Sequence, residues 1–221
     1  MAGEAGAVAG PRIQIVRVHR ASYQNGQIPR DASSSGLTTN RQFCRFARPA
    51  PGLESNRVYT TQIPEGGLCL SSFLILTEGE SQRVLMGRLD PGAPWDEIGA
   101  LDADRALTHS RGWMLPSSHL MVYESPQEAA QRILREQLGV QHLELSEAKV
   151  VSEVGTPRRF PSLARHWDFE FIFRGKMALG SAPRHDAWSE LRFIDLTRTG
   201  RQEVARSHDD VLESAGFSFS G

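Results

Sequence analysis

A helix predicted at residues 126–138 constrains the fold of this chain more than any other feature. Ser125 is a favourable N-cap, Pro126 fits the first helical position, and Glu128 completes a capping box. Gly139 follows, where a helix often ends in a left-handed residue. Apolar residues at helical spacing give the helix one face to bury, and they are Ala129, Ala130, Ile133, Leu134 and Leu138. We therefore expect this helix to pack against the main core.

The charged residues around this helix form a regular pattern. Glu124 precedes the N-cap, and Glu128, Arg132 and Glu136 follow at intervals of four, which places them on one helix face. Such a row is often a solvated ladder of weak ion pairs. We predict that Arg132 lies within ion-pair reach of Glu124, Glu128 or both. If the pairs are exposed, loss of Arg132 should loosen residues 115–125 more than it lowers overall stability.

The whole pattern resembles the Nudix box, whose family sequence is G-x5-E-x7-R-E-U-x-E-E-x-G-U, with U a bulky apolar residue. Aligned without gaps over residues 118–140, the chain matches at Glu124, Arg132, Leu134, Glu136, Gly139 and Val140. It departs at Ser118, Ile133 and Gln137, where the family has a glycine and two glutamates. The resemblance implies an α/β fold, a Nudix-like α/β/α sandwich with a mixed β-sheet, and it gives Glu124, Arg132 and Glu128 a supporting role.

The rest of the chain suits one such domain with an extension. Residues 1–64 are loop-rich and are predicted to be an N-terminal extension, whereas residues 65–221 form the Nudix-like domain with an insertion at about 89–112. Residues 115–118 are predicted to be a loop. Outside residues 113–140, alternating or apolar runs predict the domain's other elements. These are strands at 68–76, 83–88, 149–154, 165–174 and 191–196, and a helix at 206–216.

Composition limits the classes of partner. The chain has 221 residues, with 25 Lys and Arg against 26 Asp and Glu, so no overall basic field favours nucleic acid. No apolar run is long enough for a membrane span. Cys44 and Cys69 do not form a disulfide framework, which favours a reducing, cytoplasmic location. The family resemblance also leaves a homodimer open.

The resemblance implies hydrolysis of a nucleoside diphosphate linkage with Mg²⁺ or Mn²⁺, because several carboxylate oxygens are needed to hold such cations beside pyrophosphate. Glu136 is the predicted catalytic residue and a metal ligand, and Gln137 offers a neutral oxygen. Glu170 is a third candidate ligand, although it and Asp168 also fit the polar outer face of a strand. Ile133 offers no ligand.

The predicted substrate contacts are Ser117 and Ser118, and the adjacent Arg158 and Arg159. Serine permits close backbone approach to a phosphate less readily than glycine. Two functions therefore remain open. The first is a domain that binds a nucleotide-like ligand or a protein partner, with hydrolysis weak or lost. The second is an active Mg²⁺ pyrophosphohydrolase whose ligands have moved to Glu136, Glu170 and an acid of the insertion.

Overall fold

A computed structural model describes residues 67–155, 166–180, 182–205 and 207–220, and within them a six-stranded mixed sheet. The order is β4-β5-β1-β2-β6, with β3 paired to β1 beside this path. β1 runs parallel to β5, and the other pairs are antiparallel. The strands are β1 (Leu68–Glu78), β2 (Arg83–Leu89), β3 (Ser117–His119), β4 (Lys149–Gly155), β5 (His166–Met177) and β6 (Trp188–Asp195).

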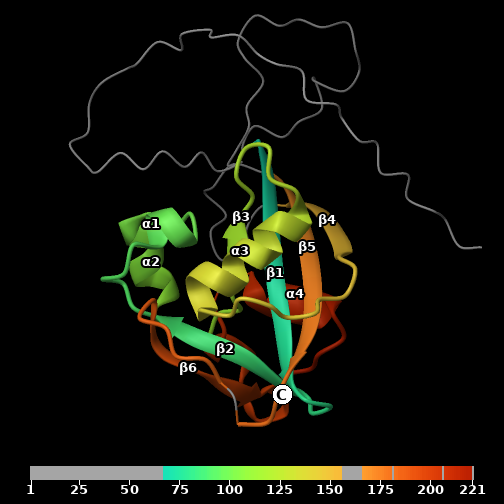
Figure 1. The fold of residues 1–221 in the computed structure, drawn as a ribbon. Coiled ribbons are helices and arrows are strands. Elements are labelled where there is room, and N and C mark those ends of the chain that lie inside the picture. Colours follow the sequence, from blue (N-terminus) through green and yellow to red (C-terminus); the bar gives the residue numbers. More distant parts are fainter. Residues whose placement is uncertain (1–66, 156–165, 181, 206, 221) are drawn as a thin grey trace, which may run out of the picture. The chain divides into compact units, whose positions relative to one another are not determined.

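Helices cover both faces of this sheet, so the predicted α/β/α sandwich is confirmed (Figure 1). α3 packs on one face and α4 on the other. Among the described residues, no helix is long and apolar enough to cross a membrane. The extension predicted at residues 1–64 lies outside the described part. The helices are α1 (Trp95–Ile98), α2 (Ala103–His109), α3 (Pro126–Leu138) and α4 (His208–Ser214), with short 3₁₀ turns at Leu196–Arg198 and Arg201–Glu203.

The capping signals of α3 act as predicted. The Ser125 hydroxyl accepts a hydrogen bond from the Glu128 backbone N–H, and the Glu128 carboxylate accepts one from the Ser125 N–H at 2.8 Å. This backbone hydrogen bond lowers the pKa of Glu128. Gly139 has φ of 66° and ends the helix, and the Val140 N–H donates back to the Leu134 carbonyl at 2.9 Å. The predicted bounds of 126–138 are confirmed.

α3 buries its apolar face against one side of the sheet. Leu134 and Ile133 are completely buried, together with Phe173 from β5. Phe73 and Ile75 of β1 lie on the opposite face, in the core beneath α4. Successive strand residues point to opposite faces, so Leu74 and Leu76 of β1 face α3 instead.

One segment differs from the sequence-based prediction, and a second contains structure on which the prediction was silent. Residues 117–119 form strand β3 rather than part of a loop, because Ser118 pairs with Ser72 of β1. The predicted insertion at 89–112 is a folded element with two helices. Its Trp95 is buried and packs edge-on against Trp188, with ring centroids 4.9 Å apart.

Candidate functional site

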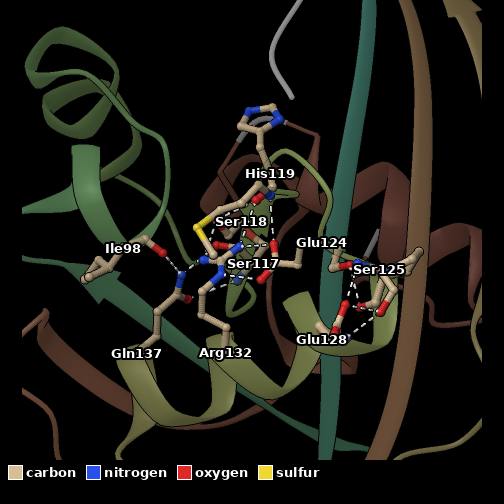
Figure 2. A network of polar contacts seen from close by, with 12 residues as sticks. Ile98, Ser117, Ser118, His119, Glu124, Ser125, Glu128, Arg132 and Gln137 are labelled. Carbon is tan, nitrogen blue, oxygen red and sulfur yellow. Dashed lines mark hydrogen bonds and ion pairs between the residues drawn. The ribbon is translucent and has the colours of Figure 1, made fainter. Parts of the chain in front are cut away.

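A buried ion pair joins α3 to the segment that precedes it (Figure 2). The Arg132 Nε and Nη2 atoms donate to the two carboxylate oxygens of Glu124 at 2.7 and 2.9 Å. The predicted pairing with Glu124 is confirmed. However, the side chains are only 3% and 7% exposed, so the expectation of a weak, solvated pair was wrong. Removing one partner of a buried pair leaves an uncompensated charge, which costs far more than breaking a surface pair.

Arg132 also holds β3 and the turn after it. Its Nη2 donates to the His119 carbonyl at 3.0 Å, and its Nη1 donates to the Ser118 hydroxyl at 3.3 Å. Glu124 in turn accepts the Met121 N–H at 2.8 Å. Within this turn Tyr123 has φ of 67° and is 98% exposed. A bulky residue rarely adopts this backbone conformation, so the turn is strained and the buried ion pair holds it in place.

Gln137 lies near the other end of α3 and uses its whole amide on backbone groups (Figure 2). Its Oε1 accepts the Ser117 N–H at 3.1 Å. Its Nε2 donates to the carbonyl oxygens of Ser117 at 2.7 Å and Ile98 at 2.9 Å. The side chain is completely buried. The amide NH₂ thus lies between two carbonyl oxygens, a place that would otherwise suit a cation. A metal bound to Oε1 would have to break the hydrogen bond that this oxygen accepts from the Ser117 N–H.

These contacts also bear on Ser117 and Ser118, which we predicted to approach a phosphate. Both backbone polar groups of Ser117 are bound by Gln137. Ser118 is 4% exposed, and its hydroxyl donates to the His119 carbonyl at 3.0 Å while accepting from Arg132. The segment is therefore held by the protein's own side chains.

Of the three helix positions that carry glutamates in the resembled pattern, one keeps a carboxylate. Ile133 is completely buried in the core beneath α3. Gln137 is committed to Ser117 and Ile98. Glu136 remains, and it is half-buried. A single carboxylate from this helix supplies little of the oxygen coordination that Mg²⁺ requires.

Glu170, the ligand predicted on a strand, lies on a different face from these residues. It shares a side of β5 with Ile172, whereas Phe171 and Phe173 point toward α3. Burial raises the pKa of Glu170 to about 8, with further contributions from the carboxylates of Asp168, Glu153 and Asp210. Glu170 is half-buried, so it does not lie on a solvated outer face, which was the alternative interpretation of this strand.

Sequence reasoning missed a polar cluster beside Glu170. The Cys69 Sγ lies 3.0 Å from His119 Nδ1, and the Ser71 hydroxyl lies 3.2 Å from the same nitrogen. Burial raises the pKa of Cys69 to about 12, so this free thiol stays protonated at neutral pH. Alternation along the predicted strand places Cys69 and Ser71 on one face. Nothing local in the sequence links either of them to His119, about fifty residues later.

Within the described ranges, no three His, Cys, Asp or Glu side chains are arranged to hold a metal ion. Arg158 and Arg159, predicted to bind substrate, lie outside those ranges. Glu124, Arg132 and Ser118 meet in one network, while Gln137 and Ser117 meet in a second contact. The carboxylate donors on α3 therefore do not fit a resident dication.

No family model matches the chain, and no curated protein matches it. It is similar to many solved structures, including three that each align over about two thirds of this chain. The Escherichia coli dihydroneopterin triphosphate pyrophosphohydrolase is 14% identical, with 66% of this chain and 92% of that chain covered and a TM-score of 0.47. A mutT/nudix family protein from Listeria innocua is 20% identical, with 66% and 90% covered and a TM-score of 0.46. The NUDIX domain of Shewanella oneidensis NrtR, complexed with ADP ribose, is 16% identical, with 67% and 86% covered and a TM-score of 0.43. At these identities and scores, function has to be inferred from this chain's own residues.

Proposed function

We propose that this chain is a Nudix-like domain that binds a nucleoside diphosphate-linked or related pyrophosphate ligand, and that its metal-dependent hydrolysis is weak or lost. The observation that carries the proposal is the amide of Gln137, which donates to the Ser117 and Ile98 carbonyl oxygens at 2.7 and 2.9 Å. A side chain that already bonds to these oxygens competes with a cation for them.

Charge supports the same conclusion. Pyrophosphate repels a nucleophile unless cations neutralise its oxygens, and those cations need several hard oxygen ligands. Ile133 and Gln137 remove two negative charges from the resembled pattern, and only Glu136 remains on the helix. The ligand would instead be held by the protein's own groups, among which Arg158 and Arg159 are the candidates for the phosphates. A nucleotide-like small molecule is the preferred ligand, and a protein partner is the alternative.

Calorimetric titration of the wild-type chain with MgCl₂ and MnCl₂ tests the metal part of the proposal, and we expect no tight site. A panel of nucleoside diphosphate sugars, ADP-ribose and dinucleoside polyphosphates, assayed with each metal, tests turnover. Thermal shifts with the same compounds in EDTA test binding without metal. Robust hydrolysis by the wild type that disappears in Glu136→Gln would overturn the proposal.

One observation favours the second function, an active Mg²⁺ pyrophosphohydrolase with rearranged ligands. Burial, together with the carboxylates of Asp168, Glu153 and Asp210, raises the pKa of Glu170 to about 8, although these four side chains as they lie are not arranged to hold a metal ion. Either a proton or a dication bound at Glu170 would relieve this repulsion. If a dication acts there, Mn²⁺ should stabilise the wild type and fail to stabilise Glu170→Gln. Equal thermal shifts in the two proteins would exclude Glu170 as a ligand.

A further inference from the structure

Two arginines lie over the same buried indole on the sheet face that α4 covers. The Arg88 Cζ is 4.7 Å from the Trp113 ring centroid, and the Arg192 Cζ is 4.9 Å from it. These distances are well within the range of cation–π attraction. The ring is 3% exposed, whereas the Arg88 and Arg192 side chains are 35% and 60% exposed.

Strand register explains why the two guanidinium groups meet. β2 and β6 lie side by side and antiparallel, with Met86 opposite Arg192 and Arg88 opposite Glu190 (Figure 1). Arg88 and Arg192 are therefore diagonal neighbours on one face, a separation of roughly 7–8 Å between backbones that long side chains easily span. The same face carries the apolar residues of the core beneath α4, including Met86.

Trp113 holds a fixed position next to Arg88 and Arg192. Its backbone N–H donates to the Glu203 carbonyl at 2.8 Å, and its backbone carbonyl accepts from the Ala205 N–H at 2.8 Å. A Cβ at the preceding Gly112 would lie 2.6 Å from the Ala205 nitrogen, which shows how closely the two backbone segments approach. These backbone contacts and the burial of the side chain fix the position of the indole on which the two guanidinium groups are stacked.

The charges on the two guanidinium groups are only partly balanced. Glu190 places one carboxylate oxygen 2.9 Å from Arg192 Nε and the other 4.0 Å from Arg88 Nε. Arg88 also donates from Nη1 to the Arg111 carbonyl at 3.2 Å, which orients its side chain. Two positive charges therefore share one carboxylate, and the Glu190 side chain is 44% exposed.

We propose that Arg88 and Arg192, stacked on Trp113, form a binding site for a phosphate dianion, with Glu190 occupying the anion position when no ligand is bound. A guanidinium matches phosphate oxygens with paired N–H donors. When Glu190 turns outward, the two arginines offer two positive charges, which a phosphoryl dianion balances and a carboxylate does not. The ligand class is a phosphomonoester or a terminal phosphate of a pyrophosphate. This site is separate from the residues around α3, so it does not depend on the proposed function.

The test uses NMR of the arginine Nε–Hε groups in the full chain, with inorganic phosphate and pyrophosphate as probes. We expect both probes to shift the Arg88 and Arg192 signals together. Arg192→Gln should weaken pyrophosphate binding by about tenfold, the effect of losing one charge-assisted contact. Glu190→Gln should strengthen it about threefold or more, because the competing carboxylate is removed. Arg198→Gln is the matched control, since that side chain is 86% exposed and pairs with Asp195 instead.

Two results would overturn the site. One is the absence of any shift of the Arg88 and Arg192 signals at tens of millimolar pyrophosphate, a range in which even weak phosphate sites fill. The other is an Arg198→Gln effect as large as that of Arg192→Gln, which would indicate a general response to charge. If Arg192→Gln fails to fold, Glu190→Gln still tests the site, because displacement of its carboxylate predicts tighter binding and unchanged binding would contradict it.

Discussion

Gln137→Glu changes one atom of the buried amide and tests the central argument about this site. In the wild type, Nε2 donates to the carbonyl oxygens of Ser117 and Ile98 at 2.7 and 2.9 Å. The substitution replaces that nitrogen by an oxygen. Two carbonyl oxygens then face a carboxylate in a completely buried position, with no proton or cation between them.

The expected loss of stability follows from these contacts. Each buried acceptor left without its donor costs about 1–3 kcal/mol. The two carbonyls and the carboxylate together should lower the free energy of unfolding by about 3–5 kcal/mol, the range seen when a buried charge loses its partner. For a chain of this size that corresponds to a melting temperature lower by about 8–15 °C. The loss should shrink below neutral pH, because burial raises the pKa of the new carboxyl, and its protonated form can donate one hydrogen bond.

A divalent cation should restore this variant, since the carboxylate and the two carbonyls are hard oxygen ligands facing one point. At a Mn²⁺ concentration about 100 times the dissociation constant, binding to the native state alone adds about 2.7 kcal/mol. The assay is thermal unfolding in EDTA and in MnCl₂, followed by circular dichroism. We expect a metal-dependent rise in melting temperature for Gln137→Glu and none for the wild type.

Gln137→Met is the control, because it removes the same hydrogen bonds without adding a charge. It should be destabilised in EDTA and should not respond to Mn²⁺. The reasoning would be refuted if Gln137→Glu melted within about 2 °C of the wild type in EDTA, less than a 1 kcal/mol change. An equal Mn²⁺ shift in the wild type would refute it as well.

Four further substitutions probe the same framework. Arg132→Met should lower the free energy of unfolding by about 3–5 kcal/mol in urea titrations, because it leaves the Glu124 carboxylate buried and unpaired; a loss below about 1 kcal/mol would match a surface pair instead. Tyr123→Asn should raise stability by about 0.5–1 kcal/mol, because asparagine accepts positive φ more readily, and an unchanged unfolding midpoint would argue against strain in this turn. Glu170→Gln should remove a pH dependence of stability. The raised pKa of about 8 means that this contribution is complete below the unfolded pKa of about 4.3 and is lost as pH rises through 8, so parallel pH profiles of variant and wild type would count against it. Ile133→Glu should prevent folding, as seen by circular dichroism, because it buries an unpaired charge, and a native-like spectrum would place Ile133 outside the core.

The elements that could be predicted from the sequence are those whose signals are local. The bounds of α3 followed from Ser125, Glu128 and Gly139, each of which acts on backbone groups within a few residues. β5 followed from the alternation of aromatic and polar residues between Trp167 and Phe173. Such signals need no knowledge of the partner segment, so they hold wherever the element packs.

Other features depend on contacts between distant segments, so prediction from local sequence was wrong or incomplete for them. Two serines have little strand propensity, and β3 exists because Ser118 pairs with Ser72 of β1. The spacing of charges on α3 suggested an exposed ladder for Arg132. Its burial follows from the return of Glu124 and from the His119 carbonyl, both outside the helix.

Two of the three departures from the resembled pattern, Ile133 and Gln137, look equivalent in the sequence, because each replaces a carboxylate with a neutral side chain. The structure shows that they are physically different. Ile133 has become part of the core beneath α3, so a carboxylate there would have to be buried among apolar side chains. Gln137 keeps the polar surroundings and supplies hydrogen-bond donors where a cation could have attracted the same two carbonyl oxygens. A single substitution could therefore reopen a cation position at Gln137, while the position of Ile133 is closed by packing. On this reasoning we propose that a ligand would be held by hydrogen bonds and arginine charge, and that any hydrolysis would have to rely on Glu136 or on the acids around Glu170.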